Sequence, residues 1–323
     1  MARKLLAALA LSVSVLWPVA AQEVELSWKF AAGQKFYQEV NTRTQQTIKL
    51  MNQEIKQEMD HTFYFSWNVK SASDKEVVIE QTVEAVRALV KLGASETKYD
   101  STAKDATDNP LAGFFKPLVG ATFTLTLDPN TMKITKVEGR EDFVNKLAQA
   151  NPQLGSLLRQ VLSEDQMRSL AEPVFSITPG KGKKIKVGET WTRDSRLSMG
   201  AVGSYDAKYT YKYAGTEKKG DLVLHKIEIT TDLKYKAPDA KEAVGLPFRI
   251  ESGDLKTAKS SGVIYFDAEK GRIVETTMDV SLSGKLDISV GDQKSPVDLE
   301  QKQITVARYL DKNPVEVAAP TPK

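Results

Sequence analysis

The stretch "SGVIYFDAEKGRIVETTM", residues 261–278, contains two runs rich in apolar and β-branched residues on either side of a polar turn. The stretch "ATFTLTLDPNTMKITKVE", residues 121–138, has the same layout and aligns with it without a gap. Asp128 aligns with Asp267, and each is followed by four loop residues and a basic residue. An Asp at the end of a strand can bond to the backbone of its own turn. Both stretches therefore predict a strand, a turn and a return strand, and they contain no paired catalytic groups.

Two further landmarks recur in the same order along the chain. "GQKFYQEV" (33–40) resembles "GETWTRDS" (188–195), and residues 63–84 resemble residues 209–230. Because three similar landmarks follow one another in one order, the sequence predicts a diverged internal duplication. Residues 140–186 lie between the two copies, and we expect them to form a helical bridge.

Alternating apolar and polar residues indicate β-strands with one face on a core and the other facing water. Residues 37–60 are interpreted as two long strands that turn near Met51–Asn52–Gln53. The predicted fold class is α+β, mainly antiparallel β, with two related β-sheet halves joined by a short helical segment. The spacing leaves open whether the halves form one continuous sandwich or open barrel, or pack as separate lobes. The clearest alternating runs are 62–69, 208–213, 222–235 and 284–290.

The predicted helices lie in the middle of the chain. Residues 140–150 predict a first helix, and Asn151–Pro152 ends it and starts a second. Ser163 and Gln166 match a capping box at the start of a third helix, which we expect to end at Pro173. The apolar stripes of these helices are expected to cover the face of a sheet. Their members are Phe143, Val144, Leu147, Leu154, Leu157, Leu158, Val161, Leu162, Met167 and Leu170.

The first 21 residues have the three parts of a secretory signal. Arg3 and Lys4 form a basic start, Leu5–Trp17 is an apolar run, and small residues lead to Ala21. The apolar run is shorter than the roughly 20 residues that span a bilayer. We expect export to the periplasm or the extracellular space, with cleavage after Ala21. The mature chain is expected to be soluble, with no transmembrane segment.

Composition argues against a nucleic-acid partner. Two of the 45 basic residues, Arg3 and Lys4, lie in the signal, so 43 remain beside 42 acidic residues. A nucleic-acid-binding protein normally has a concentrated basic face. The one dense basic run, "GKGKKIK" at 180–186, lacks the spacing and the Ser or Thr of a phosphate-binding loop. We interpret it as a solvated connection.

The residue types exclude several catalytic chemistries. The chain has no Cys, and therefore no thiol nucleophile, iron–sulfur cluster or Cys-ligated zinc. His61 and His225 lie inside strand patterns, where an ordinary hydrogen-bonded histidine is favoured over a catalytic base. Glu164–Asp165 fits the start of a helix, and Asp105 and Asp108 fit a polar loop. We therefore predict no catalytic residue, no metal site, no cofactor and no enzymatic activity.

The segment "NPLAGFFKPLVG", residues 109–120, is the candidate binding feature. The segment is a short helical turn, and we expect at least one of Leu111, Phe114 and Phe115 to reach a second surface. We predict that these residues line or cover an apolar groove. The alternative is that both surfaces are core, with the segment wedged between the sheet and the helices of 140–172.

Five short motifs are "NPLAGFFKPLVG" (109–120), "TKVEGREDF" (135–143), "VGETW" (187–191), "GLPFRI" (245–250) and "SGVIYFDAEKGRIVE" (261–275). Together they resemble a family of exported bacterial proteins that share a domain of unknown function and are frequent in planctomycete-type bacteria. The resemblance covers nearly all of the mature chain, and it implies export and a β-rich fold. It brings no established activity, cofactor or catalytic residue.

The chain divides into a signal (1–21), a first β-rich half (22–139), a helical bridge with a basic loop (140–186), a second β-rich half (187–310) and a flexible tail (311–323). The favoured function is non-catalytic binding in the envelope or periplasm, of an apolar small molecule or an envelope protein. The alternatives are a structural component of the cell envelope and a carboxylate-dependent hydrolase.

Overall fold

The computed structural model describes most of the chain after residue 22. The predicted signal, 1–21, and most of the predicted tail lie outside the described residues. The described residues are 23–51, 53–103, 110–150, 152–239, 246–291 and 293–315.

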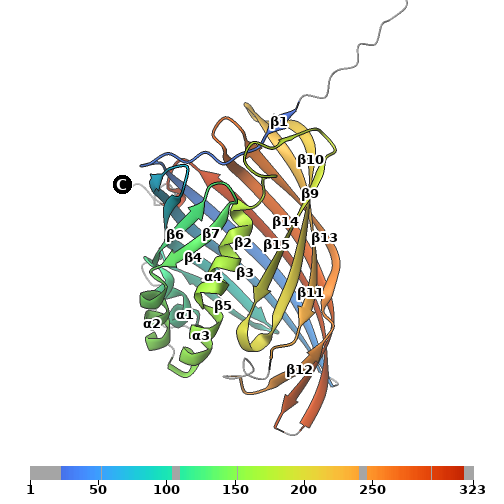
Figure 1. Cartoon of the computed structure of the whole chain (residues 1–323). Helices are drawn as coiled ribbons and strands as arrows, with labels where there is room; N and C mark the ends of the chain where they lie inside the picture. The colour runs from blue at the N-terminus through green and yellow to red at the C-terminus, as the bar shows by residue number, and fades with distance from the viewer. Residues whose placement is uncertain are drawn as a thin grey trace, which may run out of the picture.

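Within the described residues, thirteen strands form one antiparallel sheet (Figure 1). This sheet confirms the predicted fold class, mainly antiparallel β with few helices. The predicted pair of long strands is also confirmed, because β2 ends at Leu50 and β3 begins at Gln53. The strands are β2 (Lys35–Leu50), β3 (Gln53–Ala72), β4 (Val77–Leu92), β5 (Ser95–Asp100), β6 (Thr122–Asp128), β7 (Lys133–Glu138), β9 (Thr190–Ser198), β10 (Ser204–Lys219), β11 (Leu222–Lys236), β12 (Arg249–Gly253), β13 (Lys256–Asp267), β14 (Arg272–Val290) and β15 (Gln293–Leu310). A separate two-stranded sheet pairs β1 (Val24–Glu25) with β8 (Lys184–Ile185).

The order of the strands joins both halves of the chain in one sheet. It runs β7–β6–β4–β3–β2–β15–β14–β13–β11–β10–β9, with β5 beside β4 and β12 beside β14. β15, the last strand in the described residues, pairs with β2 from Val297–Leu50 to Leu310–Tyr37. The two halves therefore form one continuous sheet, and β2 and β15 are the seam between them.

The two halves contain strands in corresponding order. β2, β3, β4, β6 and β7 pair one after another in the first half, and β9, β10, β11, β13 and β14 do so in the second. Asp128 Oδ1 accepts a hydrogen bond from the N–H of Asn130 at 2.8 Å, and Asp267 Oδ1 accepts one from the N–H of Glu269 at 2.9 Å. The predicted turn bonds are thus confirmed. That the two halves superpose stays a prediction.

The helices fall where the sequence predicts them. Ser163 Oγ accepts a hydrogen bond from the N–H of Gln166 at 3.4 Å, which is the predicted cap of α4. The helices are α1 (Pro110–Phe115), α2 (Arg140–Ala150), α3 (Gly155–Val161) and α4 (Glu164–Phe175), and the 3-10 turns are η1 (Lys116–Leu118), η2 (Pro152–Leu154) and η3 (Gly200–Val202).

The prediction that the third helix ends at Pro173 is wrong, because α4 continues through Pro173 to Phe175. A proline inside a helix removes one backbone hydrogen bond and strains the preceding turn. Pro173 lies in the last turn, and Phe175 is only 2% exposed in the core. Burial of a large apolar side chain contributes about 1.5–3 kcal/mol, which offsets much of the cost of the proline.

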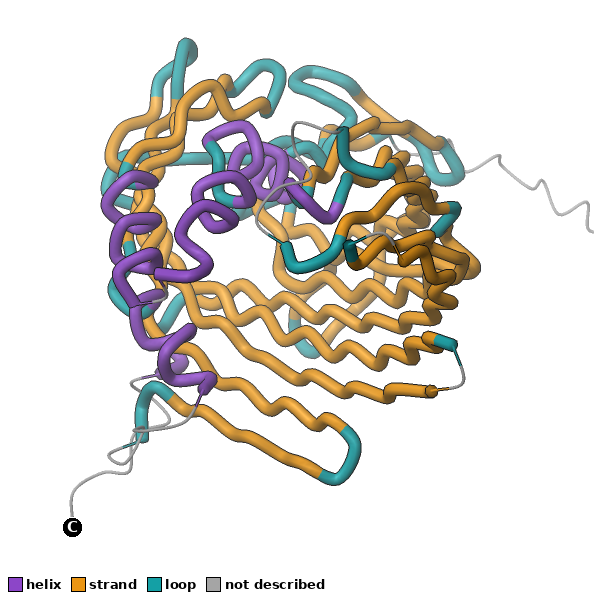
Figure 2. Tube along the Cα trace, turned by 90° about the horizontal axis from the view of Figure 1, so that it is seen from below, coloured by secondary structure: helices purple, strands orange, loops and turns teal. Residues whose placement is uncertain are grey.

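The helices lie on the concave side of the curled sheet (Figure 2). α4 contacts both edge strands, β7 and β9. Two indoles hold the C-terminal end of this helix: Trp28 Nε1 donates to the carbonyl oxygen of Phe175 at 2.9 Å, and Trp191 Nε1 donates to that of Ile177 at 3.2 Å. α4 therefore spans the gap between the two edges, and the sheet is an open barrel that this helix closes.

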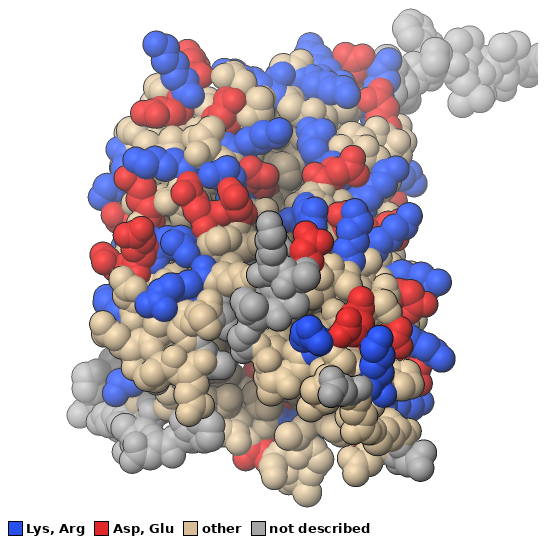
Figure 3. Space-filling model, turned by 60° about the horizontal axis from the view of Figure 1, so that its bottom comes forward, with Lys and Arg blue, Asp and Glu red and all other residues tan. Residues whose placement is uncertain are grey.

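The two faces of the sheet differ in polarity. On β2, Phe36, Gln38 and Thr42 point inward and are buried, whereas Arg43 points outward and pairs with Asp60 at 2.8 Å. Figure 3 shows Lys and Arg interspersed with Asp and Glu over the face it presents. Because exposed ion pairs contribute only about 0–1 kcal/mol each, the fold depends mainly on burial of the inner face.

Candidate ligand-binding cavity

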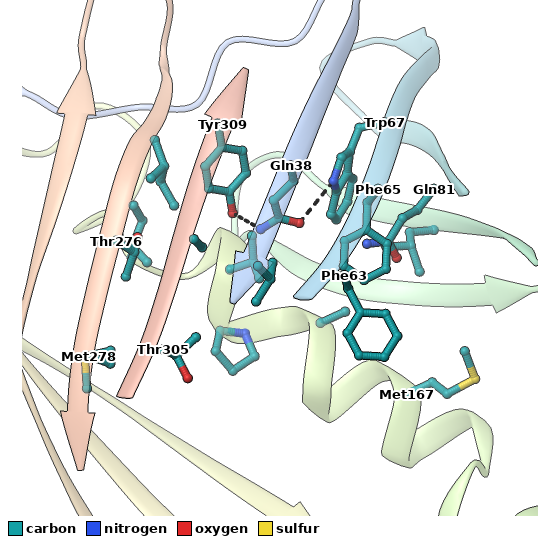
Figure 4. A pocket seen from close by; sticks show the side chains of 18 of the residues that line it. Gln38, Phe63, Phe65, Trp67, Gln81, Met167, Thr276, Met278, Thr305 and Tyr309 are labelled. Carbon is teal, nitrogen blue, oxygen red and sulfur yellow. Dashed lines mark hydrogen bonds between the residues drawn. The ribbon is translucent and has the colours of Figure 1, made fainter. Parts of the chain in front are cut away.

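The concave face of the sheet and α4 enclose a cavity of about 560 Å³ (Figure 4). Strands of both halves contribute to its wall, and α4 covers it on the side of the gap between β7 and β9. Pockets for small molecules typically measure ~300–1,000 Å³. The lining residues are Gln38, Val40, Phe63, Phe65, Trp67, Gln81, Val83, Leu118, Phe123, Leu125, Phe143, Leu162, Met167, Ala171, Pro173, Val174, Ile177, Tyr209, Tyr211, Ile229, Ile264, Ile273, Thr276, Met278, Thr305, Ala307 and Tyr309.

The wall of the cavity is apolar and uncharged. No Asp, Glu, Lys, Arg or His is among the described residues that line it. A charged group moved from water into such surroundings loses its hydration and gains no counter-ion. The cavity therefore suits a ligand whose buried part is uncharged. The polar lining residues are Gln38, Gln81, Thr276, Thr305, Tyr209, Tyr211 and Tyr309.

Three polar side chains from the seam and the strand beside it form a row along the wall (Figure 4). Trp67 Nε1, from β3, donates to Gln38 Oε1 at 3.2 Å. Gln38 Nε2, from β2, donates to Tyr309 Oη on β15 at 2.8 Å. All three side chains are buried, with at most 6% of each exposed. A buried polar row of this kind is stable because its members satisfy one another.

The tyrosines of the cavity are held in their protonated form. Burial raises the pKa of Tyr209 and of Tyr211, and the neighbouring Tyr209 raises that of Tyr211 further. Burial also raises the pKa of Tyr309. Each phenol therefore keeps its proton at neutral pH and can donate a hydrogen bond into the cavity.

The segment predicted to line or cover a groove lies beside this cavity. Leu111 and Phe115 pack in an apolar cluster that includes Phe123, which also lines the cavity. Phe114 is 40% exposed and meets the ring of Phe115 edge to face at 5.1 Å. Phe114 is thus partly exposed to solvent, while Leu111 and Phe115 pack in the apolar cluster. Among the described lining residues the segment contributes Leu118 and none of the three predicted side chains.

The two histidines lie on strands, as predicted. His225 Nδ1 is 2.8 Å from Tyr213 Oη, an ordinary hydrogen bond. The ring of His61 meets that of Phe63 edge to face at 5.7 Å, and burial lowers the pKa of His61. Neither histidine is among the described residues that line the cavity.

The acidic residues considered at the sequence level form no site in the described part of the chain. Glu164 pairs with Arg168 at 3.0 Å and Asp165 pairs with the same guanidinium at 3.6 Å, both on the surface of α4. Asp105 and Asp108 lie outside the described residues. Across the described ranges, no group of three or more His, Cys, Asp or Glu side chains could hold a metal ion.

The basic run 180–186 is mostly an exposed connection. It contains the short strand β8, which pairs with β1. Lys181 pairs with Asp74 at 3.5 Å and Lys186 with Glu23 at 3.4 Å, and these lysines are half exposed. The sequence does not indicate this strand, because it is two residues long and its partner lies far away in the chain.

The polar row of the cavity is not evident from the sequence alone. Gln38 and Tyr309 are 271 positions apart, so only the pairing of β2 with β15 brings them together. One local signal was present: Gln38 is a polar residue at an inward position between Phe36 and Val40. A polar residue on the buried face of a strand needs a partner, and the sequence does not say which residue supplies it.

The protein is thus a curled antiparallel sheet, and helix α4 closes this sheet around an uncharged apolar cavity. Residues 74–290 match the Family of unknown function (DUF6263), and the chain belongs to this family. None of the curated proteins matches the sequence. No helix in the described part of the chain is long and apolar enough to cross a membrane.

Three solved structures show a distant likeness. One is lipovitellin, from "Lipid-protein interactions in lipovitellin", which is 9% identical to this chain with a TM-score of 0.43. The match covers 91% of this chain and 26% of lipovitellin, so the chain spans about a quarter of that protein. An outer membrane channel from Pseudomonas putida F1 is 8% identical, with 88% and 97% covered and a TM-score of 0.24. The outer membrane protein OprG from Pseudomonas aeruginosa is 10% identical, with 89% and 99% covered and a TM-score of 0.20.

Proposed function

We propose that this protein is an exported, non-catalytic protein that binds an apolar ligand in the cavity between the sheet and α4. The observation that carries the proposal is the lining of this cavity: 27 described residues, none of them charged, around about 560 Å³. The signal-like first 21 residues support the export part of the proposal.

The size of the cavity favours an occupant. The cavity is partly open to solvent, so water can enter it, but apolar walls offer water few hydrogen-bond partners, at a cost in free energy. A ligand of apolar surface fills the space without that penalty.

The wall favours an elongated hydrocarbon. Phe63 and Phe65 stack at 5.8 Å and present flat apolar surface. Met167, from α4, and Met278, from β14, lie on the same wall, and thioether side chains adapt their shape to irregular ligands. Each buried CH₂ of a ligand contributes about 0.8 kcal/mol to binding. An acyl or alkyl chain therefore gains affinity with each carbon that enters.

Mass spectrometry of the protein purified from its own host tests both parts of the proposal. The intact mass of exported material is expected to correspond to a chain that begins at Gln22. Native spectra are expected to show an additional mass that is lost on extraction with organic solvent. Material that retains residues 1–21 would contradict export. Ligand binding would be contradicted if the protein showed no additional mass and also took up no apolar fluorescent probe.

A variant that fills the cavity provides the matched test. Ala307, on β15, lines the cavity, and the neighbouring Val306 points to the opposite face of the sheet. Ala307→Trp is expected to reduce uptake of diphenylhexatriene, a fluorescent hydrocarbon, at least tenfold, because the indole occupies the space of the ligand. Val306→Trp adds the same ring outside and is expected to leave uptake unchanged. Equal uptake by the two variants would place the probe elsewhere.

A further inference from the structure

The polar row on the cavity wall has a fixed direction. An indole N–H can only donate, so the atom of Gln38 that faces Trp67 must be its carbonyl oxygen. The amide nitrogen of Gln38 therefore faces Tyr309, and it too can only donate. The orientation of this amide is thus set by chemistry, although the two ends of a Gln side chain have nearly the same shape.

The direction of the row leaves one proton without an acceptor. Tyr309 Oη accepts from Gln38 Nε2, so the phenolic hydrogen must point elsewhere. Among the described residues no acceptor takes this hydrogen, although Tyr309 is only 6% exposed and lines the cavity. A buried donor without an acceptor costs about 1–3 kcal/mol, so the position favours a ligand that supplies one. Each bond of the row also polarises the next, which makes the last hydroxyl a better donor.

We propose that the cavity binds a neutral lipid that contains an ester or amide carbonyl, and that Tyr309 donates a hydrogen bond to this carbonyl oxygen. This inference rests on the proposed function, and it adds the chemical class of the ligand. The hydrocarbon part lies along the apolar wall, and the carbonyl lies beside the seam of β2 and β15.

The charge of the wall distinguishes an ester or amide from a fatty acid. An ionised carboxylate at Tyr309 would have one strong donor and no cation among the described lining residues. Such a charge is poorly stabilised in an apolar site, whereas an uncharged carbonyl needs only one donor. A plain hydrocarbon would fit the space and leave the hydrogen of Tyr309 without an acceptor.

Three pyrene-labelled probes of equal chain length test the inference: an alkane, the matching methyl ester and the matching carboxylic acid above its pKa. The wild-type protein is expected to bind the ester more tightly than the alkane and the ionised acid. Tyr309→Phe is expected to weaken ester binding about three- to tenfold, or ~0.7–1.4 kcal/mol, and to leave alkane binding unchanged. Tyr213→Phe, which removes a buried hydroxyl that does not line the cavity, is the matched control.

The outcomes separate this inference from the proposed function. If none of the probes binds the wild-type protein, the proposed function fails. If the alkane binds and Tyr309→Phe leaves ester binding unchanged, or if the ionised acid binds as tightly as the ester, the inference fails. Alkane binding by Tyr309→Phe also shows that the variant is folded. A ¹³C-labelled ester carbonyl gives a second readout, because its infrared stretch is expected to shift to lower frequency in the wild-type protein and to shift back in Tyr309→Phe.

Discussion

Phe114 and Phe115 are neighbours in the sequence, yet their side chains have different surroundings. Phe115 stacks on Tyr99 at 5.8 Å and meets Phe63 at 6.1 Å, whereas Phe114 is 40% exposed. We expect Phe115→Ala to lower the free energy of unfolding by about 2–3 kcal/mol, less than the ~3–5 kcal/mol of a fully buried phenylalanine. Phe114→Ala should lower it by less than about 1 kcal/mol. Urea denaturation of the two variants measures the difference.

Uptake of a fluorescent fatty-acid ester by the same two variants tests whether Phe114 covers the entrance to the cavity. As a cover, Phe114 should be needed for uptake although its removal hardly changes stability. Normal uptake by Phe114→Ala would leave the segment with a structural role only. Similar large losses of stability in both variants would contradict the different surroundings of the two rings.

At the residue scale, local chemistry was predictable and distant partners were not. The cap at Ser163 and the turn bonds of Asp128 and Asp267 follow from the residues next to them, and all three are present. The neighbours of Gln38 and Tyr309 along the chain give no information about their contact, because it depends on which strands become adjacent. The set of residues that line the cavity could not be predicted for the same reason.

At the element scale, the hairpins β6–β7 and β13–β14 depend on one aspartate each. Asp128 accepts hydrogen bonds from the N–H of Asn130 and from Thr131 Oγ1, and these bonds hold the pKa of Asp128 below its usual value. Asp267 accepts from two N–H groups, those of Glu269 and Lys270, and is 7% exposed.

Asp128→Ala and Asp267→Ala should each lower the free energy of unfolding by about 0.5–2 kcal/mol, by analogy with capping residues. The loss should be larger at Asp267, because the backbone groups it leaves are more buried. Neither variant should change uptake of diphenylhexatriene, since neither residue lines the cavity. Asn and Ser substitutions, which retain an acceptor, serve as controls. Loss of uptake in a folded variant would give these turns a role in binding.

The elements themselves were largely predictable, because alternation and helical stripes are local patterns. The long strands and the three helices appear as expected. The end of α4 was not predictable, because Phe175 is buried only when the core around Trp28 has formed. Tertiary packing decided the position of that boundary, and no local signal could report it.

At the scale of the whole molecule, one core joins both halves. Trp67, from the first half, and Trp191, from the second, belong to the same apolar cluster. Mature chains that keep only one of these tryptophans, with the others changed to Phe, should therefore unfold with the same urea midpoint by fluorescence and by far-UV circular dichroism. Comparing the two signals within each variant controls for any stability that the substitutions remove. A fluorescence midpoint that differs from the dichroism midpoint would indicate two lobes that unfold separately.

The pairing of β2 with β15 determines when this molecule can fold. β2 is synthesised long before β15, so a growing chain exposes one unpaired edge of β2 until β15 has followed. Contacts between such distant segments form slowly, and exposed edges recruit other chains in the meantime. The unpaired edge of β2 is therefore a site at which unfinished chains of this topology can aggregate. The lifetime of the chain in the unfolded state is therefore a property on which selection can act.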